Sequence, residues 1–442
     1  MNKLYTTLLI ACLAAGFTAC NDDDCEDLHL GNLAHYPNVL KGTFPTESQV
    51  LELGETLEIT PELLNPEGAT YSWLVNGKEY STEPTFSYKI DNPCRADLSC
   101  IIKNKYGKVE MSTSFSSNHN FSKGFFYVAD GTFNFYDTEK KTAYQDCYAS
   151  LNAGKTLGIG NYDSANIIHS NGKFYLLVGT STSNRDHFYI VDAKTLYYEN
   201  SAVVGANLNE QYGLVTGDGI RRIDLKSLNN VRIKNERLLC FYNSIIYNGK
   251  VLSNDTYKDE SKVKYYDVNE LIAAKEGEAP AVTELDIIQK QKINFVLAKD
   301  GNVYTLESAD NGCNIVKIKN DFTLEKVFAN FQPAKGPYHS SPTIGMVASE
   351  TENIIYLVST DGAIYKYILG DSDSLKAPFI AAESGVSITA PLQLNQQSGE
   401  LYVTYTEERK DESKIVVYSK DGKVLHTVDC GESVPSQILF NN

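Results

Sequence analysis

Hydrophobic and polar residues alternate in short runs between residues 31 and 118. Such a period of two predicts strands with one buried face, and turn residues such as Asn76-Gly77 separate the runs. About ninety residues with about seven short strands have the size and rhythm of an immunoglobulin-like sandwich, which we predict for residues 31–118. The clearest of these runs lie at residues 51–59, 70–74, 85–90, 96–103 and 109–115.

A different pattern recurs from residue 119 to the end, at 442. Each unit has an apolar strand, a turn with Gly or Asn, and further strands rich in Tyr, Val and Ile, as at residues 354–358 and 363–367. Seven units of about 46 residues predict a seven-bladed β-propeller, so the fold class is all-β. The apolar tail at 435–440 is expected to join the first blade and remove an open sheet edge.

The first residues read as an export signal. Lys3 precedes an apolar stretch, residues 4–17, that is too short for a permanent membrane span. We expect a signal peptide over 1–19 and an acidic tether over 20–30. A plain secretory signal or a buried helix is the alternative. Phe17-Thr18-Ala19-Cys20 resembles a lipobox, although Phe17 stands where Leu is usual, and this resemblance implies a lipid anchor on Cys20.

The acidic run after Cys20, residues 21–27, cannot pack into a core. It resembles the surface-export signal of Bacteroidetes lipoproteins. That resemblance implies a protein held in the outer membrane by its lipid and facing the exterior. A simple solvated tether is the alternative interpretation.

The net charge of −16 argues against nucleic acid or anionic lipid as a partner, so we expect membrane contact only through the anchor. Seven of the nine cysteines remain once Cys12 leaves with the signal and Cys20 carries lipid. An odd, scattered set is not a disulfide framework, although Cys94 and Cys100 are close enough in sequence to pair. No spacing of Cys and His suggests zinc.

Both predicted domains resemble known families. Residues 53–73 resemble the PKD-like domains that open many Bacteroidetes surface lipoproteins, usually as spacers, and Trp73 stands where related sandwiches bury a core tryptophan. The opposite strand has Leu57 or Ile59 where a disulfide partner would stand. Segments 131–137, 153–158, 171–175, 190–196, 399–403, 417–423 and 431–435 resemble Bacteroidetes lipoproteins with a seven-bladed, YncE-like propeller. That family includes corrinoid-capture lipoproteins on a TonB-dependent vitamin B12 transporter, and the resemblance identifies the fold better than the ligand.

No arrangement of residues predicts catalysis, a metal site or a cofactor. The seven histidines are scattered, and the chain has no HExxH, GxSxG or calcium-loop motif. Asp371 and Asp373 alternate in a polar turn, and residues 149–156 imitate a phosphate loop without its first glycine. We therefore expect a binding protein and not an enzyme.

A propeller gathers loops from all its blades around a central funnel, where a large ligand can bind. We expect the loops that lead into the innermost strands, and two loops within blades, to supply aromatic and polar contacts. Each Tyr could instead be a wedge between blades, and His339 an ordinary loop histidine. The candidate contacts are Tyr162, Asp163, Arg185, Tyr212, Tyr242, Asn243, Tyr257, Tyr338 and His339.

The resemblance implies nutrient capture for a TonB-dependent outer-membrane transporter. A corrinoid is the first choice of ligand, followed by a ferric siderophore, haem or an oligosaccharide. An adhesin or structural surface protein that makes protein contacts is the alternative, and a hydrolase without a recognisable motif is the third.

Overall fold

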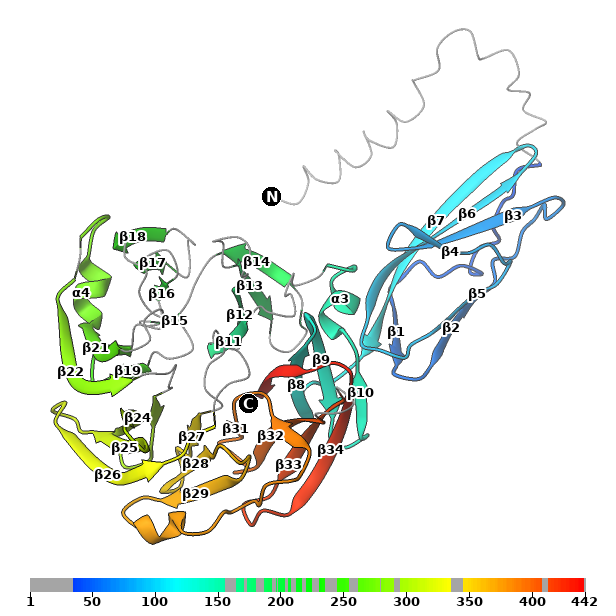
Figure 1. Ribbon diagram of the computed structural model, residues 1–442. Coiled ribbons are helices and arrows are strands. Elements are labelled where there is room, and N and C mark those ends of the chain that lie inside the picture. Colours follow the sequence, from blue (N-terminus) through cyan, green and yellow to red (C-terminus); the bar gives the residue numbers. More distant parts are fainter. Residues whose placement is uncertain are drawn as a thin grey trace. The chain divides into compact units, whose positions relative to one another are not determined.

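The computed structural model divides the chain into two compact units (Figure 1). The N-terminal domain ends at Asn118 and the propeller begins at His119, while Asn92–Cys94 group with the propeller. Nearly all regular elements are strands, so the predicted all-β class is confirmed. The structure describes residues 35–155, 164–170, 173–179, 187–192, 196, 198–202, 206–207, 212–216, 220–224, 230–234, 245–253, 261–278, 280–289, 295–334, 345–407 and 412–440.

The N-terminal domain has a five-stranded sheet of order β1-β7-β6-β3-β4 and a two-stranded sheet, β2-β5. Exposed and buried residues alternate along β2 and β6, as the sequence pattern predicts. Trp73, Phe86 and Phe115 are fully buried and form the core. The strands are β1 (Gln49–Glu52), β2 (Thr56–Ile59), β3 (Thr70–Val75), β4 (Lys78–Ser81), β5 (Phe86–Lys89), β6 (Arg95–Asn104) and β7 (Gly107–Asn118).

Trp73 occupies the predicted core position. Its indole Nε1 donates a hydrogen bond to the Glu83 carbonyl oxygen at 2.8 Å, so the buried polar atom is satisfied. Cys100 lies directly opposite Trp73 on β6, and its thiol is not joined to Cys94. The core of this domain is therefore held by aromatic and aliphatic packing.

The propeller contains seven of the nine sheets that the described residues form, because the other two belong to the N-terminal domain. In Figure 1 the first strand of each blade lies toward the middle of the ring and the last strand outside. The first four blades are β35-β8-β9-β10, β11-β12-β13-β14, β15-β16-β17-β18 and β19-β20-β21-β22. Their strands are β35 (Pro435–Phe440), β8 (Gly124–Ala129), β9 (Thr132–Asp137), β10 (Thr142–Tyr144), β11 (Ser164–Ser170), β12 (Lys173–Gly179), β13 (His187–Asp192), β14 (Tyr198–Ala202), β15 (Ala206–Asn207), β16 (Tyr212–Thr216), β17 (Ile220–Asp224), β18 (Asn230–Lys234), β19 (Ile245–Tyr247), β20 (Lys250–Ser253), β21 (Ser261–Asp267) and β22 (Val282–Gln289).

Blade 5 is the four-stranded sheet β23-β24-β25-β26, and the last two blades depart in detail from four plain strands. Blade 6 has three described strands, and an isolated bridge between Ile364 and Ile380 covers part of its outer edge. Blade 7 has its innermost strand split into β30 and β31, both paired with β32. The strands are β23 (Val296–Leu297), β24 (Val303–Ala309), β25 (Gly312–Ile318), β26 (Leu324–Phe331), β27 (Met346–Ala348), β28 (Ile354–Val358), β29 (Ile364–Ile368), β30 (Val386–Ile388), β31 (Gln393–Leu394), β32 (Leu401–Glu407), β33 (Ser413–Tyr418) and β34 (Val424–Gly431). The short helices are α3 (Cys147–Leu151), α4 (Val268–Ala273) and η3 (Ser372–Leu375).

The C-terminal strand β35 closes the ring, as predicted. It pairs antiparallel with β8, with Ile438 opposite Tyr127. Ile438 also packs in a cluster with Ile415 and Val417 of blade 7. The two ends of the propeller chain therefore share one blade, and β35 covers the inner edge that β8 would otherwise leave open.

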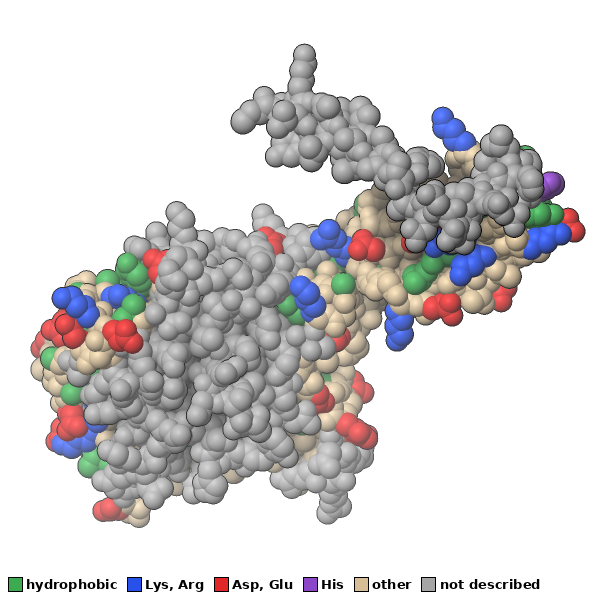
Figure 2. All heavy atoms as spheres, turned by 90° about the horizontal axis from the view of Figure 1, so that it is seen from above, with side chains coloured by type: hydrophobic (Ala, Val, Ile, Leu, Met, Phe, Trp, Pro, Cys, Tyr) green, Lys and Arg blue, Asp and Glu red, His purple; other side chains and the backbone are tan. Residues whose placement is uncertain are grey.

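The described surface carries both signs of charge. Figure 2 shows lysine and arginine side chains interspersed with aspartate and glutamate, without a continuous basic area in this view. This distribution fits the acidic composition of the chain.

Candidate functional site

The antiparallel order of each blade gives the propeller two different faces. At one face, the innermost strand of each blade begins and the second strand ends. We call this the loop face. The turns between first and second strands lie at the opposite face, which we call the turn face. In blade 6, for example, the turn at residues 349–353 joins β27 to β28 at the turn face.

Most of the predicted ligand contacts belong to segments flanked by strand ends at the loop face. Successive strands of a blade run in opposite directions. The segment that joins one blade to the next and the segment that joins the second strand to the third therefore both start and end at the loop face. These residues lie outside the described ones, as does Cys20. Tyr162 and Asp163 precede β11, Tyr242 and Asn243 precede β19, Tyr338 and His339 precede β27, Arg185 falls between β12 and β13, and Tyr257 falls between β20 and β21.

Tyr212 is a predicted contact that the structure does describe, and its expected position is wrong. The innermost strand of blade 3 is β15, and Tyr212 begins the second strand, β16, at the turn face. The Arg222 guanidinium carbon lies 5.2 Å from the centre of its ring, and the ring packs against the buried cluster that includes Ile233 and Tyr266. Tyr212 therefore packs as a wedge between blades. The sequence misplaced it because β15, with only two residues, leaves little pattern to detect.

Part of the loop face between blades 5 and 6 is well defined. Gln332 follows β26, and its Nε2 donates to the Asn311 carbonyl oxygen at 2.5 Å, while the Thr360 amide donates to the Gln332 carbonyl oxygen at 2.9 Å. Gly312 has a φ of +123°, and a Cβ there would lie 2.4 Å from the Gln332 Nε2 and 2.6 Å from the Phe331 carbonyl oxygen. Glycine is needed here for Gln332 to cross between the two blades.

Three hydroxyl groups form a row near the loop-face end of blade 7. The hydroxyls of Thr389 and Thr406 are 2.9 Å apart, and those of Thr406 and Ser413 are also 2.9 Å apart. Thr404 lies two residues before Thr406 and is 1% exposed, and its hydroxyl oxygen has no hydrogen-bond partner among the residues that the structure describes. Each hydroxyl can donate and accept, so the row suits an uncharged polar group.

Apolar side chains are exposed on two neighbouring innermost strands. Ile246 on β19 is 36% exposed and Leu297 on β23 is 41% exposed. Sequence reasoning missed both these residues and the hydroxyl row, because it looked for aromatic residues in loops. Thr404 and Thr406 at alternate positions of β32, with Ser413 at the start of β33, were the available signal. The two apolar residues lie toward the turn-face ends of β19 and β23, whereas the hydroxyl row lies at the loop face.

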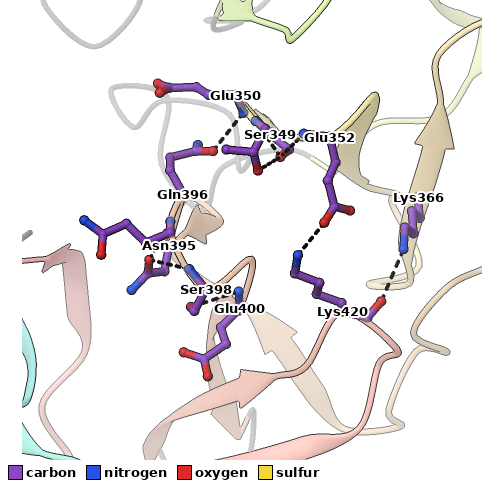
Figure 3. A network of polar contacts seen from close by, with 11 residues as sticks. Ser349, Glu350, Glu352, Lys366, Asn395, Gln396, Ser398, Glu400 and Lys420 are labelled. Atoms are coloured by element: carbon purple, nitrogen blue, oxygen red, sulfur yellow. Dashed lines mark hydrogen bonds and ion pairs between the residues drawn. The ribbon is translucent and has the colours of Figure 1, made fainter.

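The turn face between blades 6 and 7 carries a polar network (Figure 3). Lys420 forms an ion pair with Glu352, and the Lys366 Nζ donates to the Lys420 carbonyl oxygen at 3.2 Å. The Glu350 amide donates to the Gln396 Oε1 at 2.8 Å. The bond from Lys420 lowers the pKa of Glu352. These contacts join turns of adjacent blades, so we interpret the network as a structural clamp.

A similar link joins blades 4 and 5 at the same face. The Tyr247 hydroxyl donates to the Asn320 Oδ1 at 2.6 Å. Within blade 5, Asp300 accepts from Lys317 at 2.8 Å and from the Tyr304 hydroxyl at 2.9 Å. Burial alone would raise the pKa of Asp300, but these bonds outweigh it and lower the pKa. Each charged group is paired, as a structural role requires.

The described residues contain no group of three or more His, Cys, Asp or Glu side chains that could hold a metal ion. Burial raises the pKa of the Cys100 and Cys430 thiols to about 12 and that of Cys313 to about 11. These thiols are protonated at neutral pH and therefore poor nucleophiles. Within the same residues, no helix is long and apolar enough to span a membrane.

Comparison with protein families accounts for nearly all of the described chain. Residues 121–441 match the family described as a domain of unknown function, DUF5074. The chain belongs to this family. Residues 37–104 match the PKD-like domain, in agreement with the predicted N-terminal domain. None of the curated proteins matches the chain.

Among solved structures, the chain is similar to a quinonprotein alcohol dehydrogenase-like protein from Bacteroides thetaiotaomicron. The two are 98% identical, with a TM-score of 0.89 over 92% of this chain and 100% of that one. A protein from Lactobacillus plantarum is 11% identical, with a TM-score of 0.47 over 73% of this chain and 99% of that one. A putative 6-phosphogluconolactonase from Bacteroides uniformis is 10% identical, with a TM-score of 0.44 over 71% and 99%. The last two likenesses are too distant to inform function.

Proposed function

We propose that this chain is a non-enzymatic lipoprotein of the outer membrane, anchored through Cys20 and facing the exterior. It captures a nutrient on the loop face of the propeller and passes it to a TonB-dependent transporter. The observation that carries the proposal is topological: the strand ends that flank the candidate contacts of blades 2, 4 and 6 all lie at one face.

The described chemistry of the propeller favours a bulky, largely uncharged ligand. The row from Thr389 to Ser413 offers neutral hydrogen bonds at the loop face. Ile246 and Leu297 offer apolar contact further along the innermost strands, toward the turn face. Corrinoids combine broad apolar faces with amide edges, and the resemblance in sequence points the same way. An anionic siderophore would call for a basic site, which the acidic composition does not favour.

Calorimetric titration of the purified chain tests the proposal. Cobalamin, cobinamide, a ferric siderophore, haem and an oligosaccharide are titrated in turn, and we expect micromolar or tighter binding of one of them. The double variant Tyr242→Ala/Tyr338→Ala should weaken binding about tenfold or more, because aromatic anchors dominate such sites. Tyr212→Ala is the matched control and should bind normally.

Binding no tighter than millimolar for every ligand would refute nutrient capture and favour the adhesin alternative. Turnover of an alcohol in the presence of a quinone cofactor, or of a glycan or peptide, would replace it with an enzymatic function. The anchor is tested separately with Cys20→Ala, which should release the protein from the membrane fraction.

A further inference from the structure

The turn between β6 and β7 is unusually basic for so acidic a chain. Lys103, Lys105 and Lys108 fall within six residues and are all exposed. Lys103 lies directly opposite Lys108 across the two strands, and like charges in that position destabilise a sheet. We call these three lysines the basic tip.

Nearby carboxylates do not neutralise the basic tip. Glu110 follows Lys108 by two residues on the same face of β7, and Glu67 lies in the turn before β3. Among the described residues, no ion pair involves any of the three lysines. Their repulsion is thus retained in the folded domain, and a bound anion would relieve it.

The start of the described chain is fastened to the same turn. The Asn104 Nδ2 donates to the His35 carbonyl oxygen at 2.8 Å, and the rings of His35 and Tyr106 stack at 4.8 Å. The Tyr36 ring covers Gly107 so closely that a Cβ there would lie 1.8 Å from a ring carbon. The segment that leads back to Cys20 therefore leaves the domain at the basic tip.

The chain leaves toward the propeller at the other end of the domain. Strand β7 has 12 residues and ends at Asn118, so about 37 Å separates its two ends. Cys20 lies 15 residues before His35 (35 − 20). Along the chain, the basic tip is thus the end of this domain nearer to the proposed anchor.

We propose that the basic tip binds phosphate groups on the surface of the membrane that holds Cys20. This inference rests on the proposed lipid anchor. This inference departs from the expectation, drawn from the net charge of −16, that the anchor alone contacts the membrane. Salt screens charges beyond about 8 Å, so the three lysines act locally. A lipid chain and a basic patch together give stable attachment where either alone is weak. The domain is then held with the tip down and the propeller linker away from the membrane.

Vesicle sedimentation of the mature chain without its lipid (Cys20→Ala, signal removed) tests the inference. Vesicles contain equal parts of phosphatidylglycerol and phosphatidylcholine, or phosphatidylcholine alone, at low and high salt. We expect binding only to the anionic vesicles and only at low salt. Removing each lysine should weaken it about fivefold, and Lys103→Gln/Lys105→Gln/Lys108→Gln about a hundredfold. The matched control replaces Lys78, Lys140 and Lys141, which are exposed elsewhere, and should bind as the parent does.

A second variant separates binding from folding. Lys103→Glu creates an opposite-charge pair with Lys108, so it should raise the thermal midpoint slightly while weakening vesicle binding. Equal binding by parent and triple variant would overturn the inference. So would binding that develops only after the acids at 22–27 are neutralised, because that segment would then occupy the tip. Failure of the anchor would appear separately, as a Cys20→Ala chain that stays in the membrane fraction at high salt, where the basic tip does not bind.

Discussion

Ring closure by β35 makes a quantitative prediction for Ile438→Ala. The Ile438 side chain is 3% exposed, pairs opposite Tyr127 and packs against Ile415 and Val417 of the neighbouring blade. Removing a buried isoleucine to alanine costs about 3 kcal/mol from lost transfer energy and the cavity left behind. For about 320 residues at about 2.1 cal/mol/K each, the thermal midpoint of the propeller should fall by about 4–5 °C.

The assay can observe the two domains separately. Trp73 is the only tryptophan of the chain and is buried in the N-terminal domain, so its fluorescence reports that domain. Circular dichroism reports mainly the larger propeller. Ile438→Ala should shift the circular dichroism transition and leave the fluorescence transition in place.

A matched variant controls for position in the chain. Leu425 lies on the outer strand of blade 7 and is 45% exposed, so Leu425→Ala should cost about 0.5 kcal/mol or less. Equal midpoints for Ile438→Ala and Leu425→Ala would refute the argument that β35 holds the ring together.

Further predictions concern the turn, the clamp and a thiol. Gly107→Ala should lower the fluorescence midpoint of the N-terminal domain, because its Cβ meets the Tyr36 ring, and Tyr36→Ala in the same chain should restore part of the loss; an unchanged midpoint would contradict the packing. Lys420 lowers the pKa of Glu352, so the ionised Glu352 carboxylate stabilises the folded propeller. This stabilisation is fully present above the unfolded pKa, near 4.5, and is lost as pH falls through the lower folded pKa. Glu352→Gln should therefore weaken the fall in propeller stability on acidification, measured by urea unfolding at successive pH values, and a slope equal to the parent's would count against it. Burial raises the pKa of Cys100 to about 12, so peptide mapping after alkylation at pH 8 should find it unmodified in the native chain and modified in urea; rapid native labelling would show that the thiol is accessible.

Strand patterns predicted the fold because they reflect local physics. Alternation along residues 51–59 and the repeated strands from residue 119 onward depend on which side chains must leave water. The same pattern could not assign Tyr212, because its position depends on β15, a strand of two residues. A strand that short has no period to detect, and only its pairing with β16 defines it.

The sequence by itself determined the all-β class, the two domains and the closing strand, since each follows from patterns of apolar residues. The resemblance to related sandwiches placed Trp73 in the core. Only the tertiary structure decided which residues meet. It placed Thr389, Thr406 and Ser413 in one row and set Lys103 against Lys108. Such contacts depend on register between strands, and register is fixed by packing and pairing across the sheet.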